Sequence, residues 1–251
     1  MTEYHTIYDA TTKHKYITTI DEIIKIIKNN NNNEFYKFIS NEKIKISNNI
    51  VKKVEFICHR TNKICELNKI NSQFGTEIDI RDCTKTKKLI LSHDPYDEGD
   101  FFEEYIKNYK NNTLVLNIKS ERIEPECIEI LKKYNIEDYF FLDSTVPMIY
   151  LLNNKYNNTN IACRFSELEP IDFFLNISDK IKYVWVDCFN IFPLDFEKYN
   201  IIKNKNKKIC IVSPELQGQF NKIFEYRHNI IINNIIPDMI CCKLYNIIYW
   251  I

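Results

Sequence analysis

From about Val51 onward, short runs of β-branched and aromatic residues alternate with longer helical or Asn/Lys-rich stretches. This alternation is expected of βα units that build a parallel sheet. Eight runs are strand candidates, and they cover residues 54–59, 76–81, 113–119, 139–143, 160–165, 183–189, 208–213 and 239–245. A ninth run, 88–93, follows the second so closely that it predicts a hairpin-like excursion and not a barrel strand.

The number and character of these runs favour a small (β/α)8 TIM barrel. Eight strands within about 200 residues suit that fold, and the runs are nearly continuous in apolar character, as strands covered on both faces should be. An open, doubly wound sheet is the alternative. The expected outer helices are clearest at 101–109, 125–134, 147–153 and 219–229, and no strong helix is expected after the eighth run.

The first 50 residues differ from the rest of the chain. Residues 20–28 predict a short amphipathic helix, 29–33 are a run of asparagines, and 34–39 predict another helical turn. We therefore expect an N-terminal extension over 1–50 and a barrel over 51–251. Our hypothesis is that the extension packs against the barrel in place of the missing last helix, and a loosely attached tail is the alternative.

Composition excludes several classes of protein. Lys plus Arg and Asp plus Glu both number 34, so no overall charge recommends nucleic acid as a partner. The nine cysteines show neither a C-x-x-C pair nor zinc-site spacing, which predicts reduced, mostly buried thiols. The polar N-terminus and the lack of a run of roughly 18 apolar residues predict a cytoplasmic protein without a transmembrane segment. The oligomeric state stays open.

Polar residues concentrate where the first strands should end, and these ends form the functional face of a TIM barrel. They are His59 and Arg60, then Glu77 and Asp79, then His93, then Asn117 and Lys119. Glu77 and Asp79 are two residues apart, so a strand would turn both carboxylates to the same face. Two such acids inside a barrel require a metal ion or a basic partner.

Later strand ends supply further polar residues of second rank. Glu215 is a candidate contact for polar hydroxyls of a substrate, and Trp185 is either a pocket wall or part of the core. Each histidine taken alone is a weak signal, since a lone histidine is more often structural than catalytic. The grouping of His59 and His93 around the acidic pair makes a site the stronger interpretation.

Four segments together resemble the glycerophosphodiester phosphodiesterases, within the phosphatidylinositol-phospholipase-C-like TIM barrels that also include sphingomyelinase D. The segments are residues 56–60, 75–80, 91–94 and 116–119. The resemblance implies metal-assisted cleavage of a small phosphodiester. His59 and His93 would be the general base or nucleophile and the general acid. Arg60 and Lys119 would hold phosphate oxygens, while Glu77 and Asp79 would bind Mg2+ or Ca2+.

The sequence departs from this family at two positions. Asn117 stands where the family has an acidic metal ligand; an amide oxygen can still bind a hard cation but adds no charge. Acids at other strand ends could compensate, namely Asp143, Glu167, Asp187 or Glu215. Thr61 replaces a common glycine. Two alternatives to hydrolysis therefore remain: a barrel that only binds a phosphorylated ligand, and a transesterase of the sphingomyelinase D kind.

Overall fold

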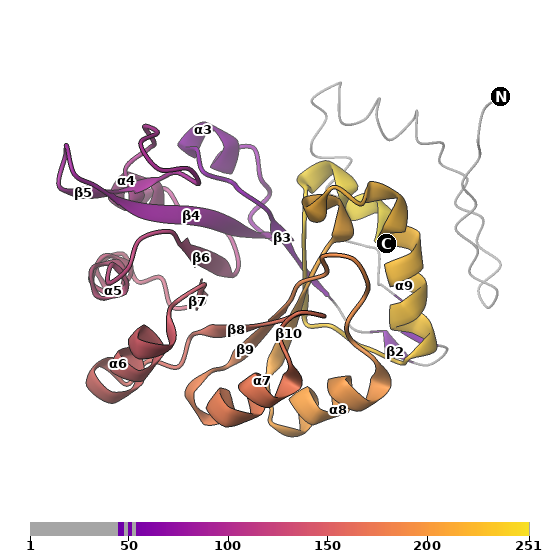
Figure 1. The fold of residues 1–251 in the computed structure, drawn as a ribbon. Helices are drawn as coiled ribbons and strands as arrows, with labels where there is room; N and C mark the ends of the chain where they lie inside the picture. Colours follow the sequence, from indigo (N-terminus) through magenta and orange to yellow (C-terminus); the bar gives the residue numbers. More distant parts are fainter. Residues whose placement is uncertain (1–44, 48–49, 52–53, 251) are drawn as a thin grey trace, which may run out of the picture.

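Eight parallel strands form a nearly closed barrel in the computed structural model, which describes residues 45–47, 50–51 and 54–250 (Figure 1). The strands are β3 (Glu55–Cys58), β4 (Gly75–Cys83), β6 (Leu114–Ile118), β7 (Tyr139–Leu142), β8 (Ala162–Phe165), β9 (Tyr183–Val186), β10 (Lys208–Val212) and β11 (Met239–Cys242). Their order around the barrel is β7-β6-β4-β3-β11-β10-β9-β8. The predicted TIM barrel is confirmed, and all eight strand candidates contain a strand.

The ninth run is the predicted excursion. β5 (Lys88–Leu91) pairs antiparallel with the far half of β4, with Ile80 opposite Leu91 and Cys83 opposite Lys88. β4 therefore extends beyond the barrel as one arm of a hairpin. The other arm, β5, returns the chain to the barrel mouth at Ser92. The Ser92 backbone N–H donates to Asp79 O over 3.0 Å.

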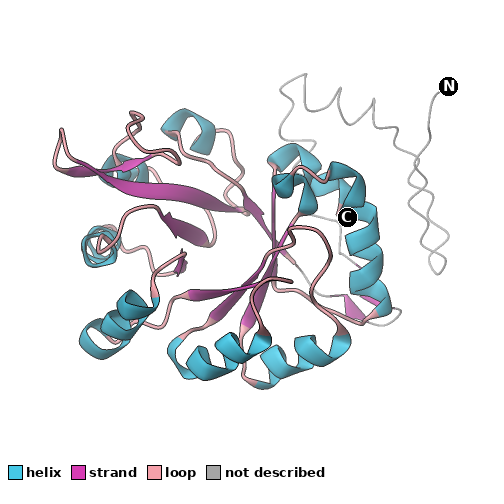
Figure 2. Cartoon of the chain, in the orientation of Figure 1, coloured by secondary structure: helices cyan, strands magenta, loops and turns pink. Residues whose placement is uncertain are grey.

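Helices lie outside the strands, as Figure 2 shows. The longer ones are α4 (Phe102–Lys107), α5 (Glu124–Lys133), α6 (Val146–Tyr156), α7 (Ile171–Ile177), α8 (Phe196–Asn204) and α9 (Ile223–Ile232), and the short α3 (Ile64–Leu67) follows β3. The four predicted helical segments are confirmed. The fourth begins as the 3-10 turn η3 (Phe220–Lys222) before α9 starts.

Alternation along the strands divides the core into two parts. One set of side chains packs between strands and helices, while a smaller set fills the barrel, including Ile57, Val115, Phe140 and Trp185. Seven of the nine free cysteines are buried, as predicted; Cys65 is exposed and Cys83 is partly exposed. A barrel interior filled with apolar side chains leaves only its mouth for polar chemistry.

After β11 the described chain forms only the 3-10 helix η4 (Leu244–Tyr249) and then the buried Trp250. The Trp250 indole N–H donates to Ser213 Oγ over 2.8 Å, which fixes this end against β10. The predicted extension of residues 1–50 lies almost wholly outside the described residues, apart from the pair β1 (Lys45–Ser47) and β2 (Ile50–Val51). No helix in the described ranges is long and apolar enough to cross a membrane.

The barrel is joined most sparsely between β7 and β8. One isolated parallel bridge pairs Phe141 with Ile161, and the Phe141 N–H donates to Asn160 O over 2.9 Å. We call this junction between β7 and β8 the seam. Side-chain contacts strengthen it, since the Phe140 ring stacks on Tyr183 of β9 with centroids 4.2 Å apart. Other neighbouring barrel strands pair over two to five residues. The seam therefore depends on side chains more than the rest of the barrel does.

Candidate active site

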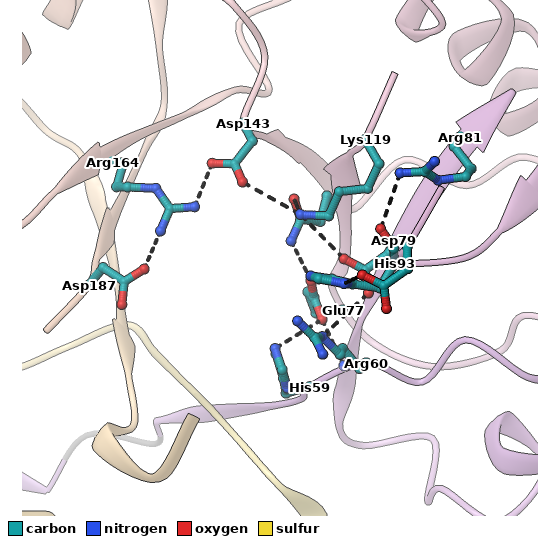
Figure 3. Close-up of polar contacts among 12 residues, drawn as sticks. His59, Arg60, Glu77, Asp79, Arg81, His93, Lys119, Asp143, Arg164 and Asp187 are labelled. Carbon is teal, nitrogen blue, oxygen red and sulfur yellow. Dashed lines mark hydrogen bonds and ion pairs between the residues drawn. The ribbon is translucent and has the colours of Figure 1, made fainter. Parts of the chain in front are cut away.

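The mouth at the carboxyl ends of the strands gathers most of the polar residues singled out by the sequence (Figure 3). Successive strands contribute charged or polar side chains that contact one another across the mouth. They are His59 and Arg60 after β3, Glu77 and Asp79 in β4, Asn117 in β6 with Lys119 after it, Asp143 after β7, Arg164 in β8, Asp187 after β9 and Lys243 after β11.

Glu77 and Asp79 both point into the mouth and are fully buried. Burial, followed by repulsion from Asp79, raises the pKa of the Glu77 carboxyl to about 7. Glu77 Oε1 accepts from Asn117 Nδ2 over 2.8 Å, and Oε2 accepts from the backbone N–H of Arg60 over 2.7 Å. The predicted placement of the two acids on one face of the strand is confirmed.

The loop after β3 wraps around this acidic pair. Arg60 adopts a left-handed backbone with φ 52°, and its N–H thereby meets Glu77 while its Nε lies 3.7 Å from Asp79 Oδ2. Asn62 holds Asp79 twice: its Nδ2 donates to Asp79 Oδ2 over 2.9 Å, and its Oδ1 accepts from the Asp79 N–H over 2.8 Å. Sequence reasoning missed Asn62, because nothing local links it to a residue 17 positions away.

His59 lies beside Glu77 with little access to solvent. Its Nε2 is 3.8 Å from Glu77 Oε2, and no described residue hydrogen-bonds to the buried Nδ1. Burial, together with the positive charges of Lys243 and Arg60, lowers the pKa of the imidazole to about 3. Lys243 is a second missed residue, and its Nζ donates to His59 O over 3.3 Å. His59 is therefore neutral near pH 7.

His93 reaches the same mouth from the end of β5 and is more open to solvent. Its Nδ1 lies 2.9 Å from Asp94 Oδ1, a geometry that suits an N–H on Nδ1. The Arg81 guanidinium donates to the carbonyls of Ser92 and His93 and so fixes the backbone here. Figure 3 shows both imidazoles beside the acidic pair.

Asn117 and Lys119 connect the acids to the next strand. The Asn117 amide donates to Glu77 and its Oδ1 accepts from Lys119 Nζ over 2.8 Å, so both ends of the amide are engaged. The same ammonium lies 3.4 Å from Asp79 Oδ1 and 3.8 Å from Asp143 Oδ2. Lys119 thus contacts oxygens from three neighbouring strands or their ends.

Arg164 continues the network along the seam side of the mouth. Its guanidinium donates to Asp187 Oδ2 and, over 2.6 Å, to Asp143 Oδ1. Glu169 Oε1 lies 4.0 Å from Arg164 Nε. Because three carboxylates surround this one cation, Arg164 organises acids and is not free to bind a phosphate.

Comparison with known proteins agrees with the fold. No protein-family model and no curated protein matches the chain. Among solved structures, a phosphodiesterase from Oleispira antarctica in complex with the product sn-glycerol-3-phosphate superposes with a TM-score of 0.53 at 15% sequence identity. The match covers 74% of this chain and 92% of that one. The chain therefore has a TIM-barrel fold similar to that of this phosphodiesterase.

Two residues that the sequence analysis ranked second occupy structural positions within this barrel. Trp185 is 4% exposed and packs edge-on against Phe140 in the barrel interior, so its core interpretation is the one the structure supports. Glu215 accepts from Ser213 Oγ and, over 3.1 Å, from the Lys243 N–H. These bonds tie β10 to β11 at the edge of the mouth.

The donors at the mouth suit a hard divalent cation, which prefers carboxylate and amide oxygens. Glu77, Asp79 and Asn117 supply such oxygens, and Asp79 Oδ1 is buried without a hydrogen bond from any residue that the structure describes. Among the described residues, however, no three His, Cys, Asp or Glu side chains are gathered as a metal site. The mouth of the barrel thus holds two buried acids, and no third is gathered with them among the described residues.

Proposed function

We propose that the protein is a divalent-metal-dependent hydrolase of phosphodiesters of the glycerophosphodiester type. The observation that carries this proposal is the convergence of His59, Glu77, Asp79, Arg60 and Lys119 in one contact network at the barrel mouth. The structural neighbour, named as a phosphodiesterase with bound sn-glycerol-3-phosphate, supports the choice of substrate class.

The charges of the mouth suit a phosphodiester. Such a substrate carries one negative charge that grows on its oxygens during displacement, and cations stabilise that growth. Arg60, whose side chain is 43% exposed, and Lys119 would bind the phosphate oxygens. Glu77, Asp79 and Asn117 would hold Mg2+ or Ca2+, and the ion would supply further positive charge at the phosphate.

The two imidazoles take different roles in the proposed reaction. His59 is neutral because its ring is buried among cations that oppose protonation. A ring nitrogen therefore keeps the lone pair that a nucleophile or a base needs. His93 is more accessible, with a side chain 36% exposed, and Asp94 beside it favours an N–H on Nδ1. We assign His59 as the base or nucleophile and His93 as the acid that protonates the leaving alcohol.

The second candidate function is binding of a phosphorylated ligand without catalysis. It is favoured by the presence of an amide, Asn117, in place of an acid. Its amide donates to Glu77 where an acid would bring a further negative charge. A site with only two acids holds a divalent ion less tightly. In that case the barrel would retain a phosphorylated ligand without turnover.

The test is hydrolysis of bis(p-nitrophenyl) phosphate and of glycerophosphocholine by the full chain with Mg2+, Ca2+ or EDTA. We expect metal-dependent activity that falls at least about 100-fold in His59→Ala and in His93→Ala. His228→Ala, an exposed histidine on α9, is the matched control and should retain activity. Phosphorus NMR of the products separates hydrolysis from a transesterase, which would release a cyclic phosphate.

Activity that survives both histidine substitutions would contradict the proposal. Absence of activity with every metal would also contradict it, and binding of glycerol phosphate in that case would favour the second candidate.

A further inference from the structure

Four acids near the mouth could supply the third carboxylate: Asp143, Glu167, Asp187 and Glu215. Both carboxylate oxygens of the last three already accept hydrogen bonds. Glu167 accepts from the backbone N–H groups of Phe189 and Asn190. Asp187 accepts from Arg164, from Gln217 Nε2 over 2.9 Å and from the Cys188 N–H over 3.0 Å. Glu215 accepts from Ser213 and Lys243.

Asp143 differs from these acids in what its second oxygen faces. Its Oδ1 accepts from Arg164, whereas Oδ2 lies 3.8 Å from the Lys119 ammonium. That ammonium is also 3.4 Å from Asp79 Oδ1, the fully buried oxygen that receives no hydrogen bond within the described chain. Asp79 and Asp143 therefore direct carboxylate oxygens at the same positive charge.

A cluster of oxygens that stabilises one cation also attracts another of higher charge. The oxygens around Lys119 Nζ come from Asn117, Asp79 and Asp143, which is the hard-donor set that Mg2+ and Ca2+ prefer. Arg164 holds the other oxygen of Asp143, as hydrogen-bonded supports commonly hold metal-binding carboxylates.

Asp143 is not gathered with Glu77 and Asp79 into a metal site as it stands. We propose that it turns Oδ2 toward these two acids and supplies the third carboxylate when a divalent cation replaces the Lys119 ammonium. The negative charge absent from Asn117 on β6 is thereby provided from the end of the neighbouring strand, β7. Lys119 competes with the ion for these oxygens and turns to the substrate phosphate when the ion binds. This inference rests on the metal dependence in the proposed function and names a ligand that the resemblance does not include.

The experiment is calorimetric titration of Mn2+ into the EDTA-treated, desalted full chain and its variants. Asp143→Asn removes one charge, and Asn tolerates the φ of 63° found at this position, so the variant should fold. Asp187→Asn is the matched control, because Asp187 is the other carboxylate that accepts a hydrogen bond from the Arg164 guanidinium. Thermal unfolding checks that both variants are folded.

We expect Asp143→Asn to weaken Mn2+ binding at least about 100-fold, as loss of a charged ligand should. Asp187→Asn, which would affect the ion only through Arg164, should weaken Mn2+ binding no more than about tenfold. Asn117→Asp should restore binding to the Asp143→Asn variant, because it returns a carboxylate to the same ion.

Equal losses in Asp143→Asn and Asp187→Asn would overturn the inference, as would unchanged binding in Asp143→Asn. A wild-type chain that binds no Mn2+ would overturn both the inference and the metal dependence beneath it. The two proposals remain separable. Binding through Asp143 without hydrolysis defeats only the proposed function, and hydrolysis with no role of Asp143 in binding defeats only the inference.

Discussion

Lys119 has the largest expected effect on the charge balance of the mouth. Its ammonium is one cation among carboxylates from β4 and from the end of β7, and its side chain is 18% exposed. The same positive charge that would help hold a phosphate also opposes a nearby divalent ion. A single side chain is thus expected to have opposite effects on two ligands.

Lys119→Met keeps the length of the side chain and removes its charge. We expect Mn2+ affinity to rise at least about tenfold, because a unit charge at about 4 Å contributes several kcal/mol at most and rather less near solvent. Hydrolysis should instead fall by about 100-fold, since a phosphate-binding cation is lost. Calorimetry and the hydrolysis assay measure the two effects. Lys133→Met, on the outer helix α5, should change neither, and a parallel fall in both quantities would argue for a merely structural role.

At the scale of elements, Gly75 sets how closely β4 approaches its neighbours. A Cβ at this position would lie 2.4 Å from Ile57 Cδ1 on β3 and 2.4 Å from the Thr113 carbonyl oxygen before β6. That carbonyl also accepts from the Thr76 N–H over 3.1 Å. The absence of a side chain at Gly75 therefore allows β4, which carries both acids, to sit between β3 and β6.

Gly75→Ala should lower the free energy of unfolding by about 1–3 kcal/mol, because overpacking forces the strands apart. Urea denaturation followed by circular dichroism measures the change. Adding Ile57→Val relieves only the flexible contact, so the double variant should not recover the stability of the wild type. A Gly75→Ala protein as stable as the wild type would mean that β4 and β6 separate without cost.

Elements were predictable from the sequence where the signal was local. Apolar runs predicted every barrel strand, and their polar ends predicted Glu77, Asp79 and Lys119 at one mouth. Helices α7 and α8 were missed, although Asp195 offered a signal for α8, since its side chain caps the helix by accepting from the Lys198 N–H. Asn62 and Lys243 take their roles from partners distant in the sequence, which no local pattern reveals.

The whole molecule combines a well-paired arc of strands with the seam between β7 and β8. Across that seam Asp143, at the end of β7, is bonded to Arg164 of β8, and Arg164 is bonded in turn to Asp187 after β9. The residue proposed as a metal ligand therefore also joins the two edges of the barrel.

Metal binding should consequently slow amide exchange at the seam. We expect peptides covering 139–143 and 160–165 to gain protection with Mg2+ in hydrogen–deuterium exchange, because an ion on Asp143 fixes the end of β7. Peptides from β9 and β10, which pair along four consecutive residues, serve as the internal control and should change little. Asp143→Asn should abolish the gain, and a gain that persists in this variant would place the effect elsewhere.

The seam has a further consequence for how the barrel responds to salt. Backbone hydrogen bonds are nearly indifferent to dissolved ions, whereas attraction between charged side chains near solvent weakens as salt is added. At the seam, the side chains of Asp143, Arg164 and Asp187 are only 29%, 25% and 3% exposed, so salt screens their mutual attraction less than that of a surface pair. Closure of the barrel beside the acids should therefore persist at ionic strengths that weaken exposed ion pairs.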